Sequence, residues 1–131
     1  MKIGFIGLGN VGAKLAGSLL RNGFDLTVRD VDQNLTDQFK SSGAKVANSG
    51  KELAEQVDLI ITSLPSLKVS SEVMEAEDGV LQGLSENKIW LEMSTTDEAE
   101  VKRIGEKVIA KSAIPLDLSL IHISEPTRPT P

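Results

Sequence analysis

The residues with the clearest chemical signature are glycines near the N-terminus, in the pattern G-x-G-x-x-G. The six residues are Gly7, Leu8, Gly9, Asn10, Val11 and Gly12. In such a turn the first glycine permits a tight bend, the second lets backbone approach a pyrophosphate, and the third lets the next helix pack closely. The chemistry would be anion binding by backbone N–H groups at the start of a helix.

The sequence on either side makes this short pattern more specific. After Lys2, residues 3–6 are β-branched, aromatic or glycine and carry no charge. This run predicts a short buried strand over residues 2–6. After the glycines, apolar residues recur at helical spacing until Asn22-Gly23, which favours a left-handed helix end. The apolar stripe that we expect on this helix consists of Val11, Leu15, Ala16, Leu19 and Leu20. Strand, glycine turn and helix together indicate dinucleotide binding, whereas a glycine-rich hairpin or a plain βα turn is the alternative.

An acidic residue follows at the distance that dinucleotide binding requires. Asp30 lies 18 residues after Gly12, just beyond the β-type run 26–28. A carboxylate there accepts hydrogen bonds from both adenosine ribose hydroxyls and repels a 2′-phosphate, which favours NAD over NADP. Arg29 could bind that phosphate, but adjacent strand residues point to opposite faces, so we do not expect both to serve one ribose. The alternative for Asp30 is a helix or turn cap ahead of Gln33.

Further along the chain, strand patterns alternate with helix patterns. We expect strands at 2–6, 26–28, 44–47, 58–64, 88–92 and 113–117, and helices at 32–42, 49–56, 66–76 and from 95 to about 108. The strand at 58–64 is apolar throughout, which indicates burial on both faces beside the first strand. Strand order reverses between these two in a doubly wound sheet, so the turn after Ser63 would lie near the cofactor. The predicted fold class is α/β, a Rossmann-type doubly wound parallel sheet that is incomplete at its C-terminal end. The single tryptophan, Trp90, is interpreted as core or pocket lining.

Composition limits the classes of partner. The 131 residues are 40% hydrophobic and 25% charged, which fits one domain. A net charge of -5 with 3% aromatic residues offers neither a basic patch nor a stacking surface for nucleic acid. There is no cysteine, no signal-peptide pattern and no apolar run of membrane-spanning length, so we expect a soluble, cytoplasmic protein without membrane contacts. The lone His122 has no companion that would suggest a metal site.

Three separated motifs together resemble the β-hydroxyacid dehydrogenase family, which includes 3-hydroxyisobutyrate dehydrogenase and the cofactor domain of 6-phosphogluconate dehydrogenase. They are the glycine turn, Ser63-Leu64-Pro65 and Glu92-Met93-Ser94-Thr95, and the similarity covers about residues 1–117. The resemblance implies that Leu64, Pro65 and Thr95 lie against the ribose and nicotinamide end of the cofactor. It also places Asp30 with the NAD-using members. Glu92 departs from the family, which more often has aspartate there.

The resemblance implies the cofactor-binding part of an oxidoreductase that transfers hydride between NAD(P) and a small 3-hydroxy acid. The full-length protein would be a homo-oligomer with that acid as its small-molecule partner. The alternatives are a non-catalytic dinucleotide-binding module and an inert fragment. No residue of this sequence is identified as catalytic or as a metal ligand.

The C-terminal residues depart from the family. Leu116-Asp117 matches the start of a family segment that contacts substrate, but Leu118-Ser119 does not continue it. The family's catalytic lysine and all-helical second domain have no counterpart, and residues 118–128 resemble one reading frame of a transposon-type sequencing adapter. We therefore expect a truncated dinucleotide-binding domain at 1–117 and a non-native tail at 118–131, disordered or loosely docked. A genuine divergent C-terminus is the alternative.

Overall fold

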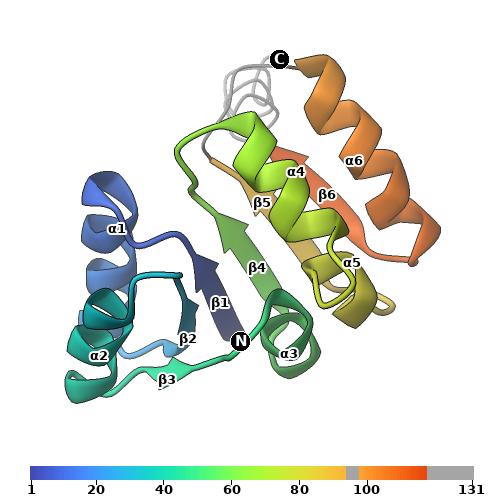
Figure 1. Ribbon diagram of the computed structural model, residues 1–131. Helices are drawn as coiled ribbons and strands as arrows, with labels where there is room; N and C mark the ends of the chain where they lie inside the picture. The colour runs from blue at the N-terminus through green and yellow to red at the C-terminus, as the bar shows by residue number, and fades with distance from the viewer. Residues whose placement is uncertain (94–97, 118–131) are drawn as a thin grey trace, which may run out of the picture.

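The computed structural model describes residues 1–93 and 98–117, which build one parallel sheet between two layers of helices (Figure 1). The strands are β1 (Lys2–Ile6), β2 (Asp25–Arg29), β3 (Lys45–Val46), β4 (Leu59–Thr62), β5 (Ile89–Glu92) and β6 (Ile114–Asp117). They are all parallel and lie in the order β3-β2-β1-β4-β5-β6. This is the doubly wound order, with its reversal between β1 and β4, so the predicted fold class is confirmed. The predicted incompleteness concerns the chain after β6, which lies outside the described residues.

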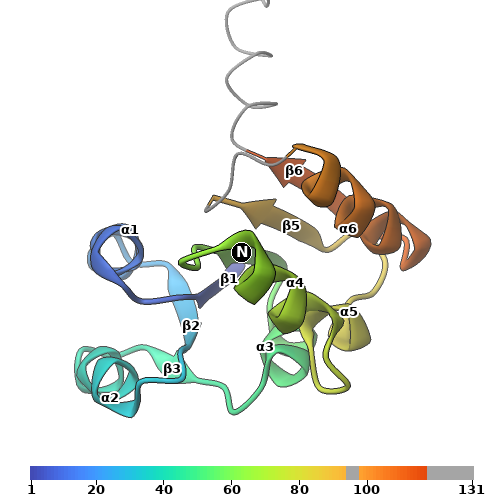
Figure 2. The same ribbon diagram turned by 45° about the horizontal axis from the view of Figure 1, so that its top comes forward.

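Helices join these strands across the described ranges. They are α1 (Asn10–Arg21), α2 (Gln33–Ser41), α3 (Gly50–Gln56), α4 (Leu67–Glu75), α5 (Val80–Gly83) and α6 (Glu98–Ala110). Figures 1 and 2 show α1 and α2 beside β1, β2 and β3, while α3 to α6 lie against the opposite face. No helix within the described ranges is long and apolar enough to cross a membrane.

Short polar side chains set where three of these helices begin. Asp32 precedes α2, and its carboxylate accepts the Asn34 N–H at 2.9 Å. Ser49 and Ser66 do the same for α3 and α4 through their hydroxyl oxygens, at 3.1 and 3.3 Å. Such caps satisfy N–H groups that have no partner inside the helix. The chain therefore has side-chain caps at the starts of α2, α3 and α4.

Each face of the sheet has its own apolar core. On one face Phe5, Leu26 and Val28 are buried against α1 and α2. On the other face the core includes Ile60 and Trp90 together with α3 to α6. These two cores fix the strands, and therefore fix where the turns at the carboxyl ends of the strands lie.

The described helices cover only one face of the last two strands, β5 and β6. In β5, Trp90 and Glu92 are buried while Ile89 and Leu91 are half-buried, because successive residues face opposite sides. Trp90 is fully buried, and its indole N–H donates to the Thr62 hydroxyl at 3.0 Å. Its interpretation as a core residue is confirmed, and it also ties β5 to the end of β4.

One member of the predicted α1 stripe is wrong. Ala16 is buried, and Leu15, Leu19 and Leu20 pack partly buried against the core. Val11 is instead 69% exposed. It lies in the first turn of α1, within the glycine pattern at the carboxyl edge of the sheet, so it lines a pocket there rather than packing on the strands.

A surface network of ion pairs holds α4 against α6. Arg103 on α6 donates to Glu75 on α4 at 2.7 Å and also contacts Glu100, while Lys107 donates to Glu75. The hydrogen bonds from Arg103 and then Lys107 hold the pKa of Glu75 at about 2, below its usual 4.5. The folded chain therefore favours the ionised form of this carboxyl group.

We expect Glu75→Gln to lower the free energy of unfolding by on the order of 1 kcal/mol at pH 7, since solvent screens this partly exposed cluster. Because the pKa of Glu75 is lower in the folded than in the unfolded chain, its carboxylate stabilises the fold at pH values above the unfolded pKa of 4.5. The difference in unfolding free energy between the variant and the unmodified chain should therefore shrink as the pH falls from 4.5 toward 2. Denaturant unfolding at pH 7 and pH 3 measures it. Glu106→Gln, the same charge change at an exposed position of α6, is the control. An equal loss at both pH values would contradict the assignment.

Candidate functional site

The first glycine of the turn is required by its backbone conformation and by its neighbour. Gly7 has φ +101°, in the left-handed region that side chains disfavour. A Cβ there would also lie well under 3.0 Å from the Ser63 carbonyl oxygen, closer than real Cβ contacts. The Ser63 N–H donates to the Ile6 carbonyl oxygen at 2.9 Å. The turn after β1 and the turn after β4 are therefore in backbone contact.

The other two glycines have different surroundings. A Cβ on Gly12 would overlap the Gly7 carbonyl oxygen, so Gly12 lets α1 pack against the turn. A Cβ on Gly9 would meet no atom within 4 Å. Gly9 lines the pocket, so the space beside it belongs to that pocket. The three positions match the three tasks expected from the sequence: a bend, an approach to a ligand, and close helix packing.

The N-terminus of α1 differs from those of α2, α3 and α4. Its N-cap is Gly9, no side chain caps it, and no acidic residue occupies its first turn. The first N–H groups of the helix therefore face the pocket without a carboxylate or hydroxyl in front of them. Together with the positive end of the helix dipole, they form a place where an anion is stabilised.

Asp30 lies beside this helix start and contacts the glycine turn directly. One of its carboxylate oxygens accepts the Leu8 N–H at 2.7 Å, and the other accepts the Asp32 N–H at 2.8 Å. The cap of α2 is Asp32, so Asp30 accepts a turn hydrogen bond but does not cap the helix. Each carboxylate oxygen can accept a further hydrogen bond, which leaves Asp30 able to receive hydroxyl groups from a ligand.

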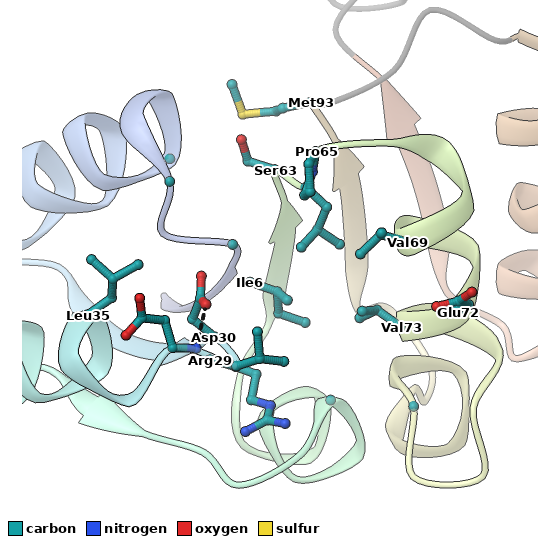
Figure 3. Close-up of a pocket in the computed structure, with 18 of the residues that line it drawn as sticks. Ile6, Arg29, Asp30, Leu35, Ser63, Pro65, Val69, Glu72, Val73 and Met93 are labelled. Atoms are coloured by element: carbon teal, nitrogen blue, oxygen red, sulfur yellow. Dashed lines mark hydrogen bonds between the residues drawn. The ribbon is translucent and has the colours of Figure 1, made fainter.

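Arg29 also lines the pocket, as the last residue of β2. Figure 3 shows its guanidinium pointing away from the Asp30 carboxylate, as expected for neighbours at the end of a strand. The two side chains therefore face different parts of the same pocket.

The pocket has a volume of about 980 Å³ and lies along the carboxyl edge of β1, β2 and β4. The sequence-predicted residues that line it are Gly7, Gly9, Asn10, Val11, Gly12, Asp30, Leu64 and Pro65. Leu8 does not line it, because its side chain is 1% exposed within the core and only its N–H reaches Asp30. Thr95 lies outside the described residues.

Sequence reasoning missed several parts of the wall, including the starts of two helices. The start of α3 contributes Ser49 and Gly50, and α4 contributes Val69 and Val73. In Figure 3 the two valines point into the pocket, opposite Leu35 of α2, while Ser63 and Met93 lie at its other end. The spacing of Val69 and Val73, one helical turn apart, was a usable signal, but only knowledge of the packing of α4 shows which face meets the pocket.

A doubly wound sheet with an uncapped helix start, a glycine turn and a carboxylate after β2 defines a dinucleotide-binding domain. The sequence pattern of the NAD binding domain of 6-phosphogluconate dehydrogenase matches residues 2–119. The chain belongs to this family, and it is an NAD(P)-binding domain of the oxidoreductase type. The resemblance to the β-hydroxyacid dehydrogenases is thereby confirmed.

Known proteins agree with this assignment. The chain is 36% identical to mitochondrial 3-hydroxyisobutyrate dehydrogenase of Rattus norvegicus over 115 residues, which are 88% of this chain and 34% of that protein. An imine reductase from Myxococcus stipitatus in complex with NADP+ shares the fold, with a TM-score of 0.81 and 18% sequence identity. The match covers 89% of this chain and 40% of the reductase chain. Mycobacterium tuberculosis 3-hydroxyisobutyrate dehydrogenase has TM-score 0.80 and 23% identity over 88% of this chain and 39% of its own. The chain thus spans about a third of the length of the curated relative.

We expect Gly9→Val to remove NAD binding while leaving the fold intact. The new side chain would fill pocket space beside the helix start, where its Cβ meets no protein atom within 4 Å. Calorimetric titration with NAD and a thermal unfolding curve measure the two effects. Gly17→Val, on the same helix but not lining the pocket, is the control for a changed helix. Retained affinity in Gly9→Val would contradict the placement of the ligand.

Proposed function

We propose that the pocket binds NAD with its pyrophosphate against Gly9 and the first N–H groups of α1. The observation that carries this proposal is the uncapped helix start beside open space at Gly9. The described pocket lining contains no lysine and one basic residue, Arg29, so the anion would be held mainly by backbone dipoles. The residues present fit a pyrophosphate because no acidic side chain occupies the first turn of α1.

The adenosine end would extend from the glycine turn toward α4. Asp30 would accept the ribose hydroxyls while keeping its bond to the Leu8 N–H. Beyond it, Val69 and Val73 offer an apolar wall for the adenine ring, and Val31 is 93% exposed on the side of Asp30. Apolar walls with a few placed polar groups are typical of cofactor sites.

The nicotinamide end would extend the other way, past Ser63 and Pro65 toward Met93, all of which line the pocket. We include Leu64 and Thr95 in this part of the proposal, on the resemblance to the family. The bound nicotinamide would supply hydride transfer, and these residues would orient its ring and exclude water.

For the whole protein we propose hydride transfer between NAD and a small 3-hydroxy acid. Relatives named 3-hydroxyisobutyrate dehydrogenase support this class of substrate. Because the chain spans about a third of the curated relative, substrate contacts and the catalytic acid or base are proposed to come from the part not matched here. A homo-oligomeric, cytoplasmic full-length protein and a non-native tail at 118–131 also stay predictions.

We expect NAD to bind at least about tenfold more tightly than NADP, a difference of about 1.4 kcal/mol. Asp30 would carry this preference, since its carboxylate accepts ribose hydroxyls and repels a 2′-phosphate. Asp30→Ala should weaken NAD binding and reduce the difference in affinity between NAD and NADP. Asp25→Ala, at the far end of β2, should have neither effect. Calorimetry with both nucleotides measures this. Equal affinities in the unmodified chain would make Arg29 the phosphate ligand instead.

We expect no NADH formation by the 131-residue chain with saturating NAD and a panel of 3-hydroxy acids. At the proposed nicotinamide end the described lining consists of Ser63, Leu64, Pro65 and Met93, none of which carries a carboxyl, amine or imidazole group. Positioned acid–base groups commonly contribute about a hundredfold to ten-thousandfold in rate. The same assay on a chain extended to the length of the relatives should show turnover. Clear turnover by the short chain would reveal a catalytic group within it.

A further inference from the structure

A buried carboxylate lies behind the pocket, at the end of β5. Glu92 is 2% exposed and Ser70 on α4 is 0% exposed. The Ser70 hydroxyl donates a hydrogen bond to the Glu92 carboxylate. Burying a carboxylate is costly unless hydrogen bonds compensate it, so this contact matters to where α4 can lie.

Both residues stand next to residues that line the pocket. Ser70 lies between Val69 and Val73 on α4, and Glu92 directly precedes Met93. Glu92 is in register with Thr62 at the end of β4, and the Met93 N–H donates to the Thr62 carbonyl oxygen at 2.9 Å. The bond from Ser70 to Glu92 therefore joins the α4 wall of the pocket to the rigid carboxyl edge of the sheet.

The other polar contacts of α4 lie on its far side. Ser71 donates to Glu100 of α6 at 3.0 Å, and Glu75 pairs with Arg103 and Lys107. These contacts hold α4 to another helix and are partly exposed to water. Among these α4 residues only Ser70 is bonded to the sheet, so its bond acts together with the buried Met74 in setting how α4 is turned toward the pocket.

We propose that Glu92 is a positioning residue for the adenosine end of the cofactor, acting through Ser70. By fixing the rotation of α4, it holds Val69 and Val73 at the place where the adenine ring packs. This inference rests on the proposed function, because it needs a dinucleotide in the pocket. It also assigns a task to Glu92, the position at which this sequence departs from the aspartate that is more usual in the family.

Ser70→Ala and Glu92→Met test the proposal, because each removes one partner of the bond with little change in volume. Calorimetry with NAD and with AMP, well below the unfolding temperature, should show both affinities weakened by about fivefold to tenfold, the equivalent of one hydrogen bond. Glu92→Gln keeps an oxygen that can accept the hydrogen bond from the Ser70 hydroxyl. This variant should therefore bind NAD and AMP with the affinity of the unmodified chain. A role in stability alone would lower the unfolding temperature without changing the affinity of the folded protein.

The control is Ser71→Ala, which removes a serine–glutamate bond from the next residue of α4 but on the side of α6. It should bind both nucleotides like the unmodified chain. Equal losses in Ser71→Ala and Ser70→Ala, or unchanged affinity in Ser70→Ala, would overturn the assignment. If Glu92→Met fails to fold, Ser70→Ala decides the outcome. Absence of NAD and AMP binding in the unmodified chain would instead overturn the proposed function and this assignment with it.

Discussion

The site depends on a close backbone contact at the centre of the sheet. Gly7 adopts a left-handed conformation against the Ser63 carbonyl oxygen, and Gly12 places α1 against Gly7. A side chain at either position would overlap a carbonyl oxygen that belongs to a rigid strand end or turn. Because β1 and β4 are neighbours in the sheet, this contact brings the start of α1 and the turn after β4 to the same edge. The proposed ligand contacts therefore depend on the contact between Gly7 and Ser63.

Within the described lining of this edge, Arg29 is the one basic side chain, and the other positive potential comes from backbone groups. Caps occupy the starts of α2, α3 and α4, whereas α1 has only Gly9 there. An acidic domain can therefore hold a doubly charged group, because unpaired N–H groups and a helix dipole act at short range in partly desolvated surroundings. Asp30 contributes in two ways: it accepts the Leu8 N–H of the turn, and it lines the pocket, where its carboxylate can accept further hydrogen bonds.

Much of this organisation was predictable from the sequence, because local patterns carried it. The glycine spacing and the apolar run that forms β4 beside β1 each depend on residues close in sequence. Only the burial of Val11 was predicted wrongly, because helical periodicity cannot show that the first turn of α1 extends beyond the strands. Val69, Val73 and the bond from Ser70 to Glu92 depend on how α4 packs against β5, 22 residues away in the sequence. That packing is tertiary, and no local pattern encodes it.

The central claim is that the start of α1 binds the pyrophosphate of a dinucleotide. Nuclear magnetic resonance of the amide groups during titration with NAD tests it most directly, because it reports each N–H separately. We expect the largest shifts at Gly9, Asn10 and Val11, with smaller shifts at Leu8 as Asp30 binds the ribose. Saturable NAD binding whose largest shifts lie away from the carboxyl edge of β1, or no binding by the folded chain, would contradict it.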